Sequence, residues 1–169
     1  MQIHSGRFKG LRIKTVKNAP YRPTTSIVRK SLFDILKNIQ GKKVLDLFSG
    51  SGIIGFEALS RGAKSITFVD SSLRVNSLLK MNSILFKEEE INFYKSDVFK
   101  FLKSCDSYDF IFADPPYRFN YIDELISRTI ECLSPDGIFI LESSHQEYSI
   151  SPYRVNEYGD TQLTFWKKN

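Results

Sequence analysis

The chain has 169 residues, of which 41% are hydrophobic and 25% charged, with a net charge of +5. This size and balance fit one soluble globular domain and exclude a disordered or collagen-like chain. No apolar run of about 18 residues occurs, and the start, Met1 to Arg7, has no apolar signal-peptide core. We therefore expect a cytoplasmic protein with no membrane span.

The positive charge is concentrated at the start of the chain. Residues 1–43 contain eleven Lys or Arg and one acid, Asp34, whereas residues 44–169 carry a net charge of −5. An ordinary solvated surface is one explanation. A basic segment of this length also attracts polyanions, which favours nucleic acid as a partner.

The first elements form a basic extension. Residues 1–14 alternate apolar and polar side chains between glycines, which predicts a short β-hairpin. Residues 15–23, with two prolines, are predicted to be a loop. Thr24 or Thr25 can cap a helix whose apolar positions continue to Ile39.

From residue 43 the pattern changes to short apolar strands that alternate with helices. The predicted strands cover 44–48, 66–70, 91–94, 110–113 and 138–141, and the predicted helices cover 53–60, 73–85, 98–103 and 122–132. Such alternation predicts a parallel sheet with helices on both faces. Two further strands, 153–158 and 161–166, flank Gly159-Asp160 and predict a terminal antiparallel hairpin. We thus expect an α/β, Rossmann-like domain over residues 42–169, preceded by the extension at 1–41.

Cys105 and Cys132 are 27 residues apart, with no Cys-x-x-Cys spacing. In a cytosolic protein this pattern predicts two reduced thiols. With only His4 and His145, a zinc site of the usual spacing is not expected.

A glycine-rich turn follows the first strand of the alternating part. From Asp46 to Gly55 the sequence reads DLFSGSGIIG, a strand end, a turn and a helix start. Glycines let the backbone approach a ligand, and a helix N-terminus favours electron-rich groups. The spacing also satisfies the dinucleotide fingerprint G-x-G-x-x-G, with Asp70 located 20 residues after Gly50, so NAD is one candidate. A tight turn without a ligand is another.

Acids at the strand ends distinguish these candidates. Asp46 would repel a pyrophosphate, but it suits a cationic amino group such as that of S-adenosylmethionine. Asp70 would accept hydrogen bonds from the ribose of either cofactor. Asp97, after the third strand, either accepts from an adenine amino group or caps the next helix.

A second motif, Asp114-Pro115-Pro116-Tyr117, follows the fourth strand, at the edge where open α/β sheets bind ligands. The prolines remove two N–H donors, which leaves nearby carbonyls and the Asp114 carboxylate as acceptors. The exocyclic amino group of a base offers two matching donors, and the acceptors would stabilise positive charge on its nitrogen during methyl transfer. Tyr117 can stack on the base. A simple Asp-Pro turn is the structural alternative.

These motifs resemble those of class I S-adenosylmethionine-dependent methyltransferases that act on base amino groups. More closely, the chain is similar to the bacterial 16S ribosomal RNA guanine-N2 methyltransferases of the D type. Besides the two motifs, the similarity includes Ser5-Gly6-Arg7, Lys9-Gly10, Arg22-Pro23-Thr24-Thr25, Val28-Arg29, the segment from Glu57 to Ala63, and Tyr158-Gly159-Asp160-Thr161.

The resemblance implies a sheet of seven strands and methyl transfer to the N2 of a guanine in 16S ribosomal RNA. It implies an assembling small ribosomal subunit as substrate. We also expect a monomer and no metal site. The expected catalytic residues are Asp114, Pro115, Pro116 and Tyr117, and the expected cofactor contacts are Asp46, Phe48, Gly50, Gly52, Asp70, Asp97 and Val98. The expected RNA contacts are Arg7, Lys9, Arg22, Thr24 and Tyr117. Many relatives have Glu at the position of Asp70. Glu142 matches an acid that is common in the family, but the sequence gives it no catalytic role.

Three other functions compete with this one. An adenine-N6 methyltransferase of DNA or RNA could use the same proline motif, although 169 residues leave no room for a separate DNA-recognition domain. A nicotinamide-dependent oxidoreductase would leave Asp114-Pro115-Pro116-Tyr117 and the basic extension unexplained. A non-catalytic RNA-binding module would not need the glycine-rich turn.

Overall fold

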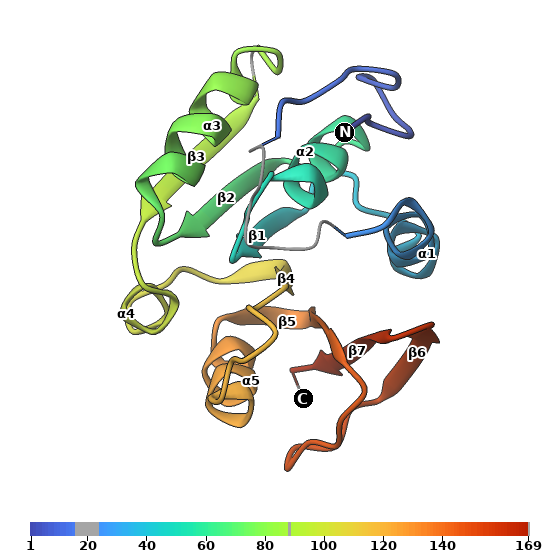
Figure 1. Ribbon diagram of the computed structural model, residues 1–169, viewed down its shortest axis with the longest axis vertical. Coiled ribbons are helices and arrows are strands. Elements are labelled where there is room, and N and C mark those ends of the chain that lie inside the picture. Colours follow the sequence, from blue (N-terminus) through green and yellow to red (C-terminus); the bar gives the residue numbers. More distant parts are fainter. Residues whose placement is uncertain (16–23, 88, 169) are drawn as a thin grey trace.

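The computed structural model describes residues 1–15, 24–87 and 89–168. A seven-stranded sheet with the order β3-β2-β1-β4-β5-β7-β6 lies at its centre (Figure 1). The strands are β1 (Lys43–Leu47), β2 (Ser65–Asp70), β3 (Glu90–Lys95), β4 (Tyr108–Ala113), β5 (Leu133–Ser144), β6 (Arg154–Tyr158) and β7 (Thr161–Lys167). The first five are parallel, whereas β7 pairs antiparallel with both β5 and β6. The predicted sheet and its terminal hairpin are therefore confirmed.

Helices cover both faces of the sheet (Figure 1). Helices α1 (Ser26–Leu36), α2 (Ile53–Ser60) and α3 (Leu73–Ser83) pack on one face, and α4 (Val98–Leu102) and α5 (Ile122–Glu131) on the other. Alternation along β1 explains the two cores, because Val44 enters the first and Leu45 and Leu47 enter the second. Among the described residues, no helix has the length and apolarity needed to span a membrane.

The start of the chain packs against the first core instead of forming a regular hairpin. One antiparallel bridge joins Gln2 and Arg12, and the buried side chains of Ile3 and Ile13 lie in the first core. Gly6 has φ +85°, and a Cβ atom there would lie 1.8 Å from the carbonyl oxygen of Ser60. The extension is therefore closely packed on α2. The predicted loop at 15–23 lies outside the described residues except at its first position.

Several element boundaries differ from the prediction, most of them by one or two residues. Helix α1 begins after Thr25, whose hydroxyl accepts from the Val28 amide, and ends at Leu36 because Lys37 leaves the helix with φ 56°. Helix α3 ends at Ser83, two residues earlier than predicted. Strand β5 starts at Leu133 instead of 138. Ser-Pro-Asp-Gly at 134–137 has turn composition, but in the structure it continues the strand through a register shift against β4.

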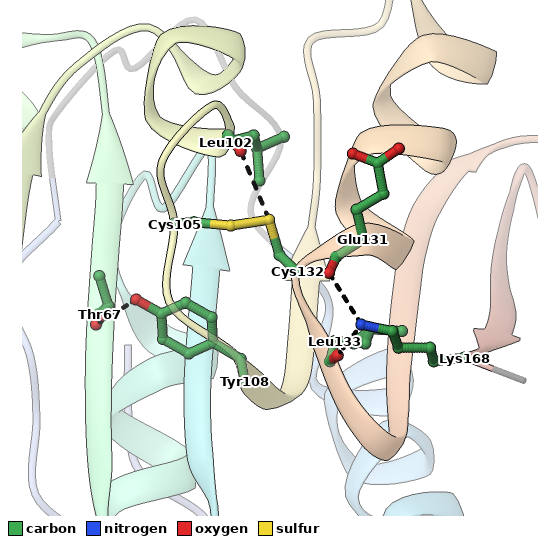
Figure 2. The surroundings of a disulfide bond; sticks show 8 residues. All are labelled: Thr67, Leu102, Cys105, Tyr108, Glu131, Cys132, Leu133 and Lys168. Atoms are coloured by element: carbon green, nitrogen blue, oxygen red, sulfur yellow. Dashed lines mark hydrogen bonds between the residues drawn. A yellow bond between two sulfur atoms is a disulfide. The ribbon is translucent and has the colours of Figure 1, made fainter.

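The prediction of two reduced thiols is wrong, because the structure joins Cys105 and Cys132 in a disulfide (Figure 2). Cys105 precedes β4 and Cys132 precedes β5, and these neighbouring parallel strands start at the same edge. The two Cα atoms are therefore only 6.2 Å apart, although 27 residues separate them in sequence. Lys168 reinforces the same edge, because its ammonium group donates to the Leu133 carbonyl at 2.8 Å (Figure 2).

Candidate functional site

Three carboxylates gather at the carboxyl ends of adjacent strands, opposite the disulfide edge. Asp46 in β1 is paired in register with Phe112 of β4, which in turn is paired with Ile140 of β5. Asp114 and Glu142 follow Phe112 and Ile140 by two residues, so both point to the same face as Asp46. The sheet thus brings together acids that are distant in sequence.

Burial and mutual repulsion act on two of these acids. Burial raises the pKa of Asp46 well above its usual range, although the Gly55 amide, which donates to its Oδ2 at 3.2 Å, opposes the shift. Burial, followed by the charges of Glu142 and Asp46, also raises the pKa of Asp114 well above its usual range. Asp114 makes no hydrogen bond to any residue in the described parts of the chain. Neither Asp46 nor Asp114 forms an ion pair with a Lys or Arg among the described residues.

The carboxylates at this edge suit a positively charged organic ligand. A positively charged ligand would stabilise the ionised forms of Asp46 and Asp114, whose pKa values burial raises, because an opposite charge favours the ionised acid. Within ranges 1–15, 24–87 and 89–168, no group of three His, Cys, Asp or Glu side chains is arranged to hold a metal ion. An ammonium or sulfonium group of a ligand meets the requirement of this cluster.

The glycine-rich turn lies beside the carboxylates. Gly50 and Gly52 both have positive φ, 52° and 74°, and Gly52 starts α2. A Cβ atom at Gly52 would lie 2.4 Å from Leu79, so this glycine is also required for packing. Asp70 at the end of β2 holds the turn, since its Oδ2 accepts from the Gly50 amide at 3.2 Å and its Oδ1 from the Ser72 amide at 2.9 Å. Each oxygen of Asp70 retains acceptor capacity for a ligand hydroxyl.

An aromatic group connects the turn to the proline motif. Phe48 has a positive φ of 55°, an uncommon conformation for a residue with a side chain. Its ring contacts Phe119, 5.3 Å away between centroids, in the loop after β4. Phe119 in turn packs on Phe99 and Tyr121. These four rings form an apolar wall at the carboxyl ends of β1 and β4, which suits a flat heterocycle.

The structure places the remaining predicted site residues at the same edge with different exposures. Asp97 caps α4, because its Oδ1 accepts from the Lys100 amide at 3.0 Å, and Val98 is buried in the second core. The capping interpretation of Asp97 is thus confirmed. Tyr117 is 89% exposed, so its ring is available to an incoming partner. Pro115 is half-buried and Pro116 exposed.

The predicted RNA contacts are distributed over the N-terminal extension. Lys9 is exposed, whereas the exposed Arg7 forms an ion pair with Glu89. Thr24 is buried and donates a hydrogen bond to Glu142 at 2.9 Å. Arg22 lies outside the described residues.

Three features were not predicted from the sequence. Thr24 and Glu142 are 118 residues apart, and no pattern in either segment indicates their contact. The apolar wall could have been anticipated, because Phe119 and Tyr121 follow the proline motif within five residues. Glu57 on α2 is fully buried and contacts Arg29, Arg61 and the start of the chain, a network that sequence periodicity does not show.

Comparisons with known sequences find relatives over most of the chain. The family described as conserved hypothetical protein 95 matches residues 1–167. The ribosomal RNA small subunit methyltransferase D of Haemophilus influenzae is 32% identical over 160 residues, which cover 90% of this chain and 83% of that protein. The putative rRNA methyltransferase YlbH of Bacillus subtilis is 31% identical over 182 residues and covers 99% of each chain.

Comparisons with solved structures agree with the fold. The putative methyltransferase yhhF from Escherichia coli superposes with a TM-score of 0.88 at 26% identity, covering 99% of this chain and 97% of that chain. An RNA methyltransferase from Salinibacter ruber, in complex with S-adenosyl-L-homocysteine, superposes with a TM-score of 0.69 at 16% identity, covering 87% of this chain and 94% of that chain. The predicted class I methyltransferase fold is confirmed.

Proposed function

The chain belongs to the family described as conserved hypothetical protein 95, and on that premise we propose that it methylates ribosomal RNA with S-adenosylmethionine. The observation that carries the proposal is the cluster of Asp46, Asp114 and Glu142 beside the glycine-rich turn. The relatives named as ribosomal RNA methyltransferases support the substrate class. At the finer level, the target is the N2 of a guanine in 16S ribosomal RNA of an assembling small subunit.

Residues of the turn and of the neighbouring strand ends hold the cofactor. S-adenosylmethionine, when bound, supplies a methyl group activated by a positive sulfur. Asp46 accepts from its amino group, and Asp70 accepts from its ribose hydroxyls. Gly50 and Gly52 allow close approach of the backbone. The adenine contacts are assigned to Phe48, Asp97 and Val98.

Residues of the proline motif hold the base. Asp114 and the backbone carbonyls around Pro115 and Pro116 accept the two hydrogens of the guanine amino group. These acceptors stabilise positive charge on the nitrogen as the methyl group arrives. Tyr117 stacks on the extruded base. No strong general base is needed, because the nitrogen becomes acidic only as it is methylated.

The basic extension, residues 1–41, is the part that we assign to RNA binding. Lys9, Arg7, Arg22 and Thr24 lie in it, and its net charge is opposite to that of the rest of the chain. We place the protein in the cytoplasm, where ribosomal subunits assemble, and expect it to act as a monomer.

Two measurements test this function. Calorimetry should detect binding of S-adenosylhomocysteine but not of NAD. Tritiated methyl groups should then enter small-subunit particles from a methylation-deficient strain, and mapping should locate them on a guanine N2. Label on an adenine N6 would favour the alternative methyltransferase, and NAD binding without label would overturn the proposal.

Asp46→Ala is expected to weaken cofactor binding by about 1.5–3 kcal/mol, because a charge-assisted hydrogen bond to the ligand amino group is lost. Asp34→Ala is the matched control, since Asp34 is an exposed acid on α1 and the change in net charge is the same. Calorimetry with S-adenosylhomocysteine measures the cofactor affinity of both variants. Equal affinities in the two folded variants would remove Asp46 from the cofactor site.

Lys9→Ala is expected to reduce the salt dependence of RNA binding by about one unit of slope or less, because one phosphate contact is lost. Arg7→Ala should have the smaller effect, since Glu89 already pairs with the Arg7 guanidinium. Fluorescence polarisation of labelled RNA at several salt concentrations gives both slopes. Parent-like slopes in a Lys9→Ala, Arg7→Ala double variant would contradict RNA binding by this segment.

A further inference from the structure

A cavity of about 340 Å³ lies between the start of the chain and the first turn of α1. His4, Thr24, Ser26 and Arg29 are among the residues that line it. The proposed roles of the carboxylates, the glycine-rich turn and the apolar wall do not use this cavity. Its lining supplies hydrogen-bond donors from three sources.

The first source is the Arg29 guanidinium, which is only 2% exposed. Its Nη2 donates to the Gln2 carbonyl at 3.0 Å and to His4 Nε2 at 2.6 Å. Its Nε has no hydrogen-bond partner among the described residues, and the Glu57 carboxylate lies 3.8 Å from that atom. Its Nη1 makes no hydrogen bond to any residue in the described part of the chain. A buried cation with unused donors is costly unless an anion accompanies it.

The second source is the N-terminus of α1, a helix of 11 residues. Thr25 satisfies the amide of Val28 through its hydroxyl, and its carbonyl accepts from the amide of Arg29. The amides of Ser26 and Ile27 donate to no described residue. These amides and the helix dipole favour a negative charge at this end.

The third source is His4. Burial, followed by the neighbouring Arg29, lowers the pKa of its imidazole. Because Nε2 accepts from Arg29, the ring proton is on Nδ1. In the described part of the chain, Arg29 and Arg61 share the one carboxylate of Glu57, which leaves an excess of one positive charge in this group.

The cavity adjoins both halves of the proposed active site. Thr24, in its wall, donates to Glu142 at 2.9 Å, next to Asp114. Met1, also in its wall, accepts a hydrogen bond at its sulfur from Ser51 of the glycine-rich turn at 3.3 Å. A group bound there is therefore close to the position where the methyl group is transferred.

We propose that this cavity binds a phosphate group of the RNA backbone, next to the nucleotide whose base is methylated. The identity of the polyanion rests on the proposed function, whereas the chemistry of the site, a phosphate held by Arg29, His4 and the first amides of α1, does not. Holding the backbone at this point would position the target base against Asp114 and Tyr117.

Ser26→Glu tests the cavity without endangering the fold. A carboxylate in the first turn of α1 favours the helix dipole, so the variant should melt at or above the parent temperature. The same carboxylate repels a phosphate in the cavity. Ile27→Glu is the matched control, because Ile27 is 74% exposed, is next in the helix and does not line the cavity.

The two histidines allow a direct measurement in the cofactor-free protein. Titration with inorganic phosphate should move the NMR signals of the His4 ring in a saturable way and leave His145 unchanged. The His4 shift should persist in Ile27→Glu and disappear in Ser26→Glu. No saturable His4 shift, or an equal shift in Ser26→Glu, would overturn the site.

RNA binding distinguishes a backbone phosphate from free phosphate. Ser26→Glu should weaken RNA binding about tenfold, the loss of one phosphate contact, whereas Ile27→Glu stays within about twofold of the parent. A His4 shift together with parent-like RNA binding by Ser26→Glu would overturn the assignment to RNA. Because the phosphate titration requires no methyl transfer, a failure of the proposed function would be recognised separately.

Discussion

Replacing Asp114 by alanine is expected to slow single-turnover methyl transfer by about 10²–10³-fold, because a preorganised acceptor is lost where positive charge develops. Cofactor affinity should be retained, since the assigned cofactor contacts come from other strand ends. Asp109→Ala is the matched control: Asp109 is in the same strand, but it lies at the opposite edge and binds the Lys43 amide. Turnover in that variant should remain near that of the parent.

Thermal melting separates this chemical role from a structural one. Asp114 makes no hydrogen bond to a described residue, and its pKa is raised by burial and by Glu142 and Asp46. A carboxyl whose folded pKa lies above its unfolded pKa reduces stability as the pH rises between the two values, and the loss persists above them. At neutral pH, Asp114→Asn should therefore melt at or above the parent temperature in the cofactor-free protein, while turnover falls.

The alternative, a turn built by Asp114 and the two prolines, gives the opposite result. It requires stability and activity to fall together in both variants. Near-normal turnover of Asp114→Ala would contradict the proposed chemistry whichever cofactor binds. Tyr117 provides an independent comparison, because Tyr117→Phe keeps the stacking ring whereas Tyr117→Ala loses about 1–3 kcal/mol of stacking.

The sequence predicts the sheet well because its inner strands are buried on both faces. Short apolar segments such as Val44 to Phe48, interrupted only by Asp46, and Phe110 to Ala113 are typical of strands in a parallel sheet. The start of β5 was missed because Ser134 to Gly137 has turn composition, and tertiary pairing with β4 overrides that preference. Local composition cannot show which neighbouring strand will hold such a segment.

In the candidate site, too, local sequence patterns predict the strand-end residues, whereas contacts made by tertiary packing are missed. Asp46, Asp70 and Asp114 were predicted because each ends a strand, and parallel strands end at one edge of the sheet. The contact of Thr24 with Glu142 depends on how the extension crosses that edge, which is a property of the packed structure. The disulfide was missed for a similar reason, since only the pairing of β4 with β5 brings Cys105 near Cys132.

Glu57→Gln is expected to lower the free energy of unfolding by about 3–5 kcal/mol, the cost of breaking a buried ion pair and leaving one partner charged. Glu57 is fully buried, and its carboxylate accepts from the amides of His4 and Ser5 at 2.8 and 3.1 Å. It also accepts from Arg61 Nε at 2.9 Å and lies near the buried Arg29. Without this charge, the buried Arg29 and the half-buried Arg61 lose the carboxylate that they share.

Glu124→Ala is the matched control, because its ion pair with Arg128 is exposed and also spans four residues of a helix. Its loss should change stability by about 0.5 kcal/mol or less. Urea unfolding measures both changes, and hydrogen exchange of residues 1–15 identifies the segment that is released in Glu57→Gln. Since Glu57 joins the extension to α2, the RNA affinity of Glu57→Gln should also fall. S-adenosylhomocysteine should still bind to the folded fraction of this variant. Parent-like protection of residues 1–15 in Glu57→Gln would show that apolar packing of Ile3 and Ile13 alone holds the extension in place.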